Sequence, residues 1–126
     1  MRILIVDDSS IMRTLIKRVL TLTAVPVDDI LEAGNGVEAL AILESRDVQL
    51  LLTDINMPVM TGIELLRRIA ADERWNGLTR VVISTDGSSC RREEVAGLDV
   101  RCYLEKPFSP EVMRDVLTEV ARSAGA

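Results

Sequence analysis

Short apolar runs alternate along the chain with longer segments in which apolar residues recur every three to four positions. The runs have the length of β-strands and lie at 2–6, 29–33, 48–53, 80–84 and 100–104. β-branched residues, which favour extended structure, recur in these runs. The pattern predicts five strands, and the strong apolar character of the first, third and fourth indicates that these three are central in a sheet.

The segments between the runs have the period of amphipathic helices. The expected inward positions are Met12, Leu15, Ile16 and Val19; Val37, Leu40, Ala41 and Leu43; Ile63, Leu66, Ile69 and Ala70; and Val112, Met113, Val116, Leu117 and Val120. Ser9 or Ser10 is the expected cap of the first helix, and Ser109 that of the last. The segment 89–97 has few apolar positions, so it is predicted to be the most lightly packed helix.

Strands that alternate with helices predict an α/β fold, in which a parallel sheet is covered on both faces. The chain has 126 residues, which suits a single domain over 1–126. Ligands of such sheets bind beyond the carboxyl ends of the strands, where the strand order reverses. That edge is therefore where candidate chemistry is expected.

Composition excludes several classes of function. The net charge of −5 argues against direct binding to nucleic acid or to an anionic membrane, and no apolar run approaches the roughly 20 residues of a membrane span. The start of the chain does not resemble a signal peptide, and Cys90 and Cys102 form no metal-binding spacing, so a cytoplasmic location is expected. The absence of histidine excludes histidine-based catalysis and a phosphohistidine on this chain.

Charged and hydroxyl residues follow four of the five runs. The first run ends in Asp7-Asp8, the third in Asp54, the fourth in Ser84-Thr85-Asp86 and the fifth in Glu105-Lys106-Pro107. Carboxylates gathered at one edge repel each other unless a cation joins them. Oxygen ligands without histidine indicate Mg²⁺, and an aspartate beside Mg²⁺ and a lysine is suited to attack phosphorus.

The order of these motifs resembles the receiver domain of two-component response regulators, in particular the stand-alone CheY-like type. The motifs are Asp7-Asp8, "TDINMP" around Asp54, the hydroxyl residue Thr85 and "KPF" at 106–108, and the resemblance covers essentially the whole chain. It implies a flavodoxin-like, doubly wound (βα)5 fold with a five-stranded parallel sheet in the order 2-1-3-4-5.

The resemblance also implies a role for each site residue. Asp54 would be the phospho-acceptor, and Lys106 would pair first with Asp54 and then with the phosphoryl group. Asp8, with Asp7 behind it or bound through water, would hold Mg²⁺ together with Asp54 and the backbone carbonyl of Asn56. The chain would catalyse only its own phosphorylation and dephosphorylation, so it would not be an enzyme in the metabolic sense.

A conformational switch is implied as well. Thr85 would donate its hydroxyl to the phosphoryl group, Tyr103 would swing inward, and the Lys106–Pro107 bond would be cis. The expected partners are a sensor histidine kinase or phosphotransfer protein and a separate output protein. The face that they or a second copy of the chain would recognise consists of 89–97, the fifth strand and the last helix.

Three positions depart from the pattern of the family. Asp86 stands where Ala or Gly is usual; its carboxylate would slow phosphoryl transfer, unless it points to solvent. Thr61 stands where Asp is frequent and can serve the same turn. Asp99 stands where a helix-ending Gly is common, and it tolerates the left-handed conformation better than most residues.

Two other functions are compatible with parts of this pattern. A docking or dimerisation module of the same fold would need no phosphate, and Asp86 is the feature that favours it. A phosphatase with an aspartyl nucleophile would carry an acid two residues after the nucleophile, where this chain has Asn56. A flavin site is disfavoured because the acids of "DDSS" would repel its phosphate. Each site residue also has a plainer alternative, namely a turn, cap or surface role.

Overall fold

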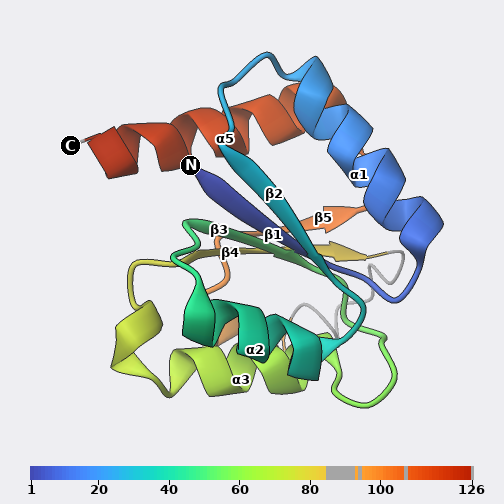
Figure 1. The fold of residues 1–126 in the computed structure, drawn as a ribbon, viewed down its shortest axis with the longest axis vertical. Coiled ribbons are helices and arrows are strands. Elements are labelled where there is room, and N and C mark those ends of the chain that lie inside the picture. The colour runs from blue at the N-terminus through green and yellow to red at the C-terminus, as the bar shows by residue number, and fades with distance from the viewer. Residues whose placement is uncertain (85–92, 94, 107, 126) are drawn as a thin grey trace.

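The computed structural model describes residues 1–84, 93, 95–106 and 108–125, and of 123–125 the backbone only. Within these residues, five strands form one parallel sheet in the predicted order β2-β1-β3-β4-β5 (Figure 1). The strands are β1 (Arg2–Val6), β2 (Asp29–Ala33), β3 (Leu50–Thr53), β4 (Thr79–Ser84) and β5 (Cys102–Glu105). The ends of β3, β4 and β5 differ from the predicted runs by one or two residues.

Helices cover both faces of the sheet. α1 (Ser10–Leu22) and α5 (Pro110–Gly125) lie on one face, and α2 (Gly36–Ser45) and α3 (Gly62–Ala70) lie on the other (Figure 1). The short 3-10 helix η1 (Glu73–Trp75) follows α3. Among the described residues these elements give the doubly wound α/β architecture that the sequence predicts.

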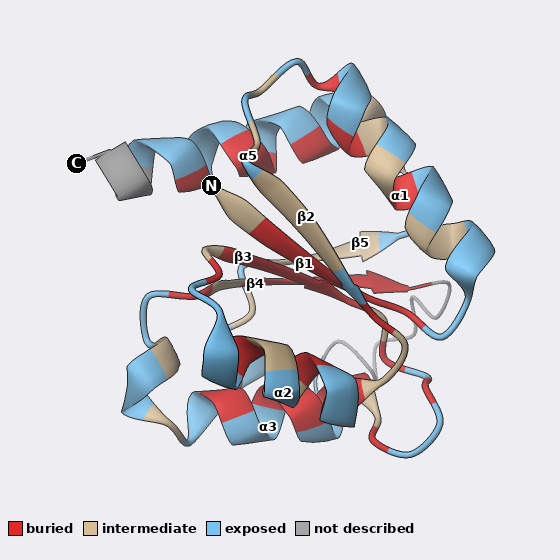
Figure 2. Cartoon of the chain, viewed as in Figure 1, coloured by how far each residue is buried: buried red, intermediate tan, exposed pale blue. Residues whose placement is uncertain are grey.

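The core consists of two apolar layers, one on each face of the sheet (Figure 2). Successive residues of a strand point to opposite faces, so Leu51 belongs to the layer under α2 and α3, whereas Leu52 belongs to the layer under α1 and α5. β1, β3 and β4 are buried along nearly their whole length. The predicted central position of these three strands is therefore confirmed.

Short polar side chains cap the helices at their amino ends. The side chains of Ser9, Asn35 and Thr61 each accept a hydrogen bond from the backbone N–H three residues further on, at the starts of α1, α2 and α3. Thr61 forms a reciprocal capping box with Glu64, so threonine does serve this turn. Ser109 Oγ accepts from the backbone N–H of Val112 at 3.4 Å at the start of α5.

The inward faces of the helices differ in part from the prediction. Five residues expected to face inward are exposed: Leu15, Val37, Ala41, Ala70 and Val112. In α1, α2 and α3, Leu20, Ala39 and Leu65 are buried although they were not expected to face inward. The buried stripes of α1, α2 and α3 are therefore displaced slightly from the predicted ones, whereas four of the five residues predicted for α5 are buried.

Close packing of α2 explains the largest of these differences. A Cβ atom on Gly36 would lie only 2.7 Å from Cγ of Met60, in the loop before α3. The small residues Gly36 and Ala39 therefore face inward where the helix approaches this loop, and the larger Val37 is left 49% exposed. Apolar periodicity alone does not register such a contact, because it ranks residues by hydrophobicity and not by size.

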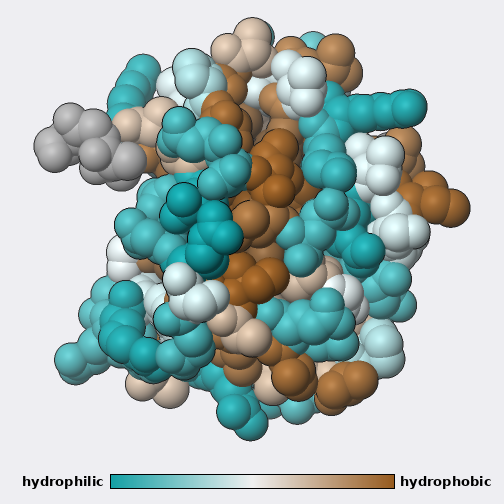
Figure 3. Space-filling model, in the orientation of Figure 1, coloured by the Kyte–Doolittle hydropathy of each residue, from teal (hydrophilic) through white to brown (hydrophobic). Residues whose placement is uncertain are grey.

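β2 is an edge strand, and its apolar residues are only partly covered. Ile30 and Leu31 are half-buried, and Figure 3 shows a hydrophobic strip across the front of the molecule over this strand. Charged pairs flank the strip, because Asp29 contacts Arg2 and Glu32 contacts Lys17. Charges beside an open edge oppose pairing with a further strand.

Arg80 is a charged residue inside the sheet, on the same face as Val82, and its side chain is 2% exposed. Its guanidinium donates to the backbone carbonyl of Trp75 at 2.9 Å and to Leu98 O and Asp99 Oδ2 at 3.3 Å each, while Nε has no partner. Asp99 has a φ of 57°, which confirms the predicted left-handed conformation. Arg80 thus joins β4 to the two chain segments on either side of it.

Some predictions fall outside the described residues. These are Thr85, Asp86, Cys90, the Lys106–Pro107 bond and most of the helix predicted over 89–97. Glu93, Val95 and Ala96 are helical, and Val95 is buried in the layer under α2 and α3. Within the described part of the chain, none of the helices combines the length and apolar character that crossing a membrane requires.

Candidate functional site at the carboxyl edge of the sheet

The candidate site lies where β1, β3 and β5 end. Backbone hydrogen bonds continue one residue beyond each strand: Asp7 N–H donates to Ala33 O, Asp54 N–H to Val6 O, and Lys106 N–H to Ser84 O, at 2.9–3.1 Å. The three site residues are thus held by the hydrogen-bond ladder of the sheet. The parallel register brings side chains that are far apart in sequence to one edge.

Lys106 forms ion pairs with two of the acids. Its Nζ lies 2.9 Å from Asp7 Oδ2 and 3.4 Å from Asp54 Oδ2. The side chains of Lys106, Asp7 and Asp54 are 9%, 3% and 14% exposed. The predicted contact with Asp54 is present, and Asp7 is a closer partner that the sequence did not predict.

The three carboxylates differ in how they are held. Asp7 Oδ1 accepts from the backbone N–H of Ser9 at 2.9 Å, so both Asp7 oxygens have partners. Asp54 Oδ1 accepts from Ile55 N–H at 2.7 Å, which leaves Oδ2 toward Lys106. Asp8 is exposed, and no hydrogen bond or ion pair holds its carboxylate among the residues that the structure describes.

The cluster fits a hard divalent cation. One oxygen from each of Asp7, Asp8 and Asp54 lies within 4.8 Å of the other two, which is comparable to the span of roughly 4 to 5 Å between opposite oxygen ligands of such an ion. Lys106 can balance only one of the three negative charges. Oxygen ligands with a surplus of negative charge favour Mg²⁺ or a similar ion.

The loop after Asp54 is packed against its own start. Gly62 N–H donates to Ile55 O at 2.8 Å, and a Cβ atom on Gly62 would lie 2.0 Å from the carbonyl oxygen of Asp54. Only glycine allows this approach. Val59 in the same loop has a φ of 70°, an unfavourable conformation for a β-branched residue. The tight loop therefore fixes the backbone that carries Asp54 and Asn56.

The other predicted residues lie around this cluster. Asn56 is exposed in the loop, two residues after Asp54. Tyr103 is half-buried on β5, opposite Val82 of β4, and contacts the apolar layer under α2 and α3. Thr85 follows β4 and is not among the described residues.

One residue at this edge was missed in the sequence. Arg13 of α1 donates from Nη1 to the backbone carbonyl of Asp7 and from Nε to Glu32 Oε1 at 3.0 Å. Lys17, one turn further along α1, donates to the other Glu32 oxygen at 2.9 Å, and this bond and that from Arg13 lower the pKa of Glu32. The sequence did offer a signal for this contact, because Arg13 and Lys17 are spaced i and i+4 on one helix face shortly after Asp7-Asp8.

Comparison with known proteins defines the class. A family model described as the response regulator receiver domain matches residues 3–118, so the chain belongs to the response regulator receiver family. Within it, the chain is of the CheY type. It is 40% identical over 121 residues to a chemotaxis protein CheY homolog of Campylobacter jejuni (95% of this chain and 92% of that protein). It is 39% identical to chemotaxis protein CheY1 of Helicobacter pylori (95% and 96%).

A solved structure agrees. The chemotaxis response regulator CheY4 of Vibrio cholerae superposes with a TM-score of 0.80 at 28% identity, over 94% of this chain and 97% of that one. Its similarity extends through nearly all of the sheet and helices described above.

Proposed function

We propose that the chain is a phosphorylation-activated switch in which Asp54 accepts a phosphoryl group, with Mg²⁺, from a histidine kinase or phosphotransfer protein. The observation that carries the proposal is the convergence of Asp7, Asp8, Asp54 and Lys106 at one sheet edge, in a chain of the receiver family. A separate output protein would then recognise the changed surface predicted from the sequence, which comprises 89–97, β5 and α5. A second copy of the chain is another partner for the same surface.

The chemistry follows from the positions of the side chains. Asp54 attacks phosphorus through a carboxylate oxygen, an O–P bond forms, and the bond from phosphorus to the donor breaks with its electron pair leaving on the donor. Lys106, 3.4 Å from Asp54 Oδ2, is placed to pair with a phosphoryl oxygen, while Asp7 keeps its ammonium in position. Mg²⁺, held by Asp8, Asp54 and the carbonyl of Asn56, would supply further positive charge to the phosphoryl oxygens.

The switch would begin when a phosphoryl group carrying roughly −1.5 to −2 charge units takes the place of the single carboxylate charge of Asp54. Thr85 would donate its hydroxyl to the phosphoryl group, and Tyr103 would move into the space that Thr85 leaves. The half-buried position of Tyr103 on β5, between the apolar layer and the surface, supports this role. A free-energy shift of about 1–3 kcal/mol between two conformers is enough for regulation.

Intact-mass measurement tests the proposal. The full chain is incubated with a small phosphodonor such as acetyl phosphate, with Mg²⁺ and with a chelator. We expect a gain of one phosphoryl group that requires Mg²⁺ and is absent in Asp54→Asn. No gain in the wild-type chain would instead indicate a docking module of the same fold, and a gain that persists in Asp54→Asn would show that another residue is the acceptor.

A further inference from the structure

Arg13 lies outside the cluster of Asp7, Asp8 and Asp54 but contacts its backbone. The sheet edge that carries these three acids is called the acidic edge below. Its side chain is 19% exposed and is held by Glu32, whose carboxylate also accepts from Lys17. From this anchored position, Nη1 reaches the carbonyl oxygen of Asp7. That carbonyl belongs to the peptide group between Asp7 and Asp8, so the hydrogen bond restricts the backbone rotation that orients the second acid relative to the first.

Asp8 depends on this restraint more than its neighbours do. The carboxylate of Asp7 is fixed directly by Lys106 and by Ser9 N–H, and that of Asp54 by Ile55 N–H and Lys106. The carboxylate of Asp8 has no such partner in the part of the chain that the structure describes. Its position is therefore set through the backbone, at the peptide group that Arg13 holds.

We propose that Arg13 is a positioning residue for the cation site: it holds the Asp7–Asp8 peptide group and thereby directs Asp8 toward the ion. This inference rests on the proposed function, because it assumes that the acidic edge binds Mg²⁺. Glu32 completes the arrangement, since it anchors the guanidinium and offsets the positive charge that would otherwise repel a cation.

Replacing Arg13 should change the affinity for Mg²⁺ in two ways that have opposite signs, so the direction of the measured change distinguishes them. Loss of a nearby positive charge strengthens cation binding, whereas loss of the hydrogen bond to Asp7 O weakens it. Groups that orient metal ligands typically change metal affinity by about 10- to 100-fold. We expect Arg13→Met to raise the dissociation constant for Mg²⁺ about 10-fold, because losing the orientation of Asp8 should weaken binding more than losing the positive charge strengthens it.

Lys17→Met is the matched control. It removes the other cation from Glu32 with the same replacement, but it leaves the hydrogen bond to Asp7 O in place. We expect this variant to bind Mg²⁺ as the wild-type chain does. Arg13→Lys should recover part of the affinity, since an ammonium can donate to the carbonyl but cannot reach Glu32 and Asp7 O as a fork.

The experiment is calorimetric titration of the full chain with MgCl₂ at low and at high KCl, with urea unfolding of each variant. A loss of affinity in Arg13→Met that persists at high salt, where charge effects are screened, supports the proposal. Unchanged or tighter binding overturns it, as does an equal loss in Lys17→Met. If Arg13→Met does not fold, Arg13→Gln is measured with the same expected outcomes. Absence of Mg²⁺ binding in the wild-type chain would overturn the proposed function, and this inference with it.

Discussion

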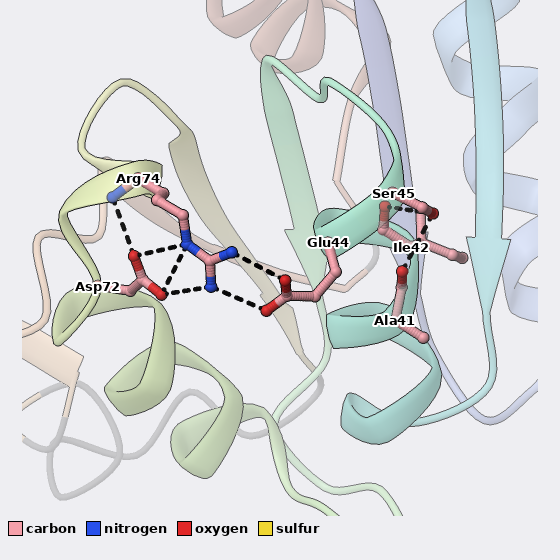
Figure 4. A network of polar contacts seen from close by, with 6 residues as sticks. All are labelled: Ala41, Ile42, Glu44, Ser45, Asp72 and Arg74. Atoms are coloured by element: carbon pink, nitrogen blue, oxygen red, sulfur yellow. Dashed lines mark hydrogen bonds and ion pairs between the residues drawn. The ribbon is translucent and has the colours of Figure 1, made fainter.

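At the carboxyl edge of the sheet, Lys106 and Asp7 form an ion pair whose side chains are 9% and 3% exposed; near the amino edge, Arg74 and Glu44 form one whose side chains are 59% and 50% exposed. The exposed pair has the more numerous contacts. Arg74 donates to both Glu44 oxygens at 2.8 and 2.9 Å and to Asp72 Oδ2 at 2.7 Å (Figure 4). The length and number of hydrogen bonds alone would therefore suggest that the exposed network around Arg74 matters more than the buried one around Lys106.

Burial explains the difference. Water and salt screen the charges of Arg74, Glu44 and Asp72, and exposed pairs of this kind contribute little to stability. At the carboxyl edge the same types of group are withdrawn from water, so their charges act strongly on each other and on any ion that binds. Of these two networks, the unbalanced and partly desolvated one lies at the edge where chemistry is proposed.

The largest effect is expected where the backbone itself is packed at the carboxyl edge. A Cβ atom in Gly62→Ala would meet the carbonyl of Asp54 at 2.0 Å, and backbone cannot move aside as a side chain can. We expect urea unfolding to show a loss of about 3 kcal/mol, the upper end of overpacking costs. Gly36→Ala is the control, because its Cβ meets the flexible side chain of Met60, and it should lose less. Equal losses in the two variants would contradict this account of the loop.

A second effect is expected at Arg80, the buried arginine that contacts Trp75 and Leu98. Arg80→Met keeps much of the side-chain volume but leaves two carbonyls that had accepted its hydrogen bonds, so a loss of about 2 kcal/mol is expected. Asp99→Asn removes only the negative charge of the exposed partner of the same arginine and should lose much less. If Asp99→Asn destabilised the protein as much as Arg80→Met does, burial would not explain how much each partner of this ion pair contributes to stability.

A smaller effect on stability is expected from Lys106→Met, and it should depend on Mg²⁺. Without the ammonium the three carboxylates face each other unbalanced, and a loss of about 1 kcal/mol is expected in the presence of a chelator. Removal of this positive charge should also tighten Mg²⁺ binding, so added Mg²⁺ should raise the unfolding midpoint of the variant more than that of the wild-type chain. A midpoint that Mg²⁺ leaves unchanged in both proteins would contradict the prediction.

The smallest effect is expected in the exposed network. Arg74→Met should lower the urea midpoint only slightly at neutral pH, because exposed ion pairs contribute little to stability. Hydrogen bonds to Arg74 lower the pKa of Glu44 and of Asp72 below their ordinary values of 4.5 and 3.8. Any stability that the network contributes is therefore present above those values and is lost as the pH falls through the lowered pKa values. The difference between the two proteins should shrink from pH 7 to pH 3, and a difference that grows on acidification would contradict this sign.

The fold was largely predictable from the sequence, since its strands and helices are set by apolar periodicity and capping residues. Leu4, Leu51 and Val82 belong to runs that the sequence predicts as buried strands, and Ser9 was one of the two caps predicted for the first helix. The rotation of α2 was not predictable, because it depends on the contact between Gly36 and Met60, which are far apart in sequence. The burial of Arg80 was likewise hidden, since a charged residue at the start of a strand is ordinarily taken to face solvent.

The sequence predicted which residues form the site better than it predicted the contacts among them. Parallel strands bring Asp7, Asp54 and Lys106 to one edge, whatever the details of their side chains. The sequence did not show that Lys106 lies nearer to Asp7 than to Asp54, nor that Arg13 reaches the carbonyl of Asp7. Both contacts depend on side-chain conformations that only the packed structure determines.

Calorimetric titration of the wild-type chain and two matched variants with MgCl₂ tests the central claim most directly. The account predicts one Mg²⁺ site per chain, a dissociation constant at least about 10-fold higher in Asp8→Asn, and wild-type affinity in Asp28→Asn, an exposed acid before β2 that lies outside the cluster. The absence of saturable binding in the wild-type chain, or equal binding by Asp8→Asn, would show that the acidic edge is not a cation site.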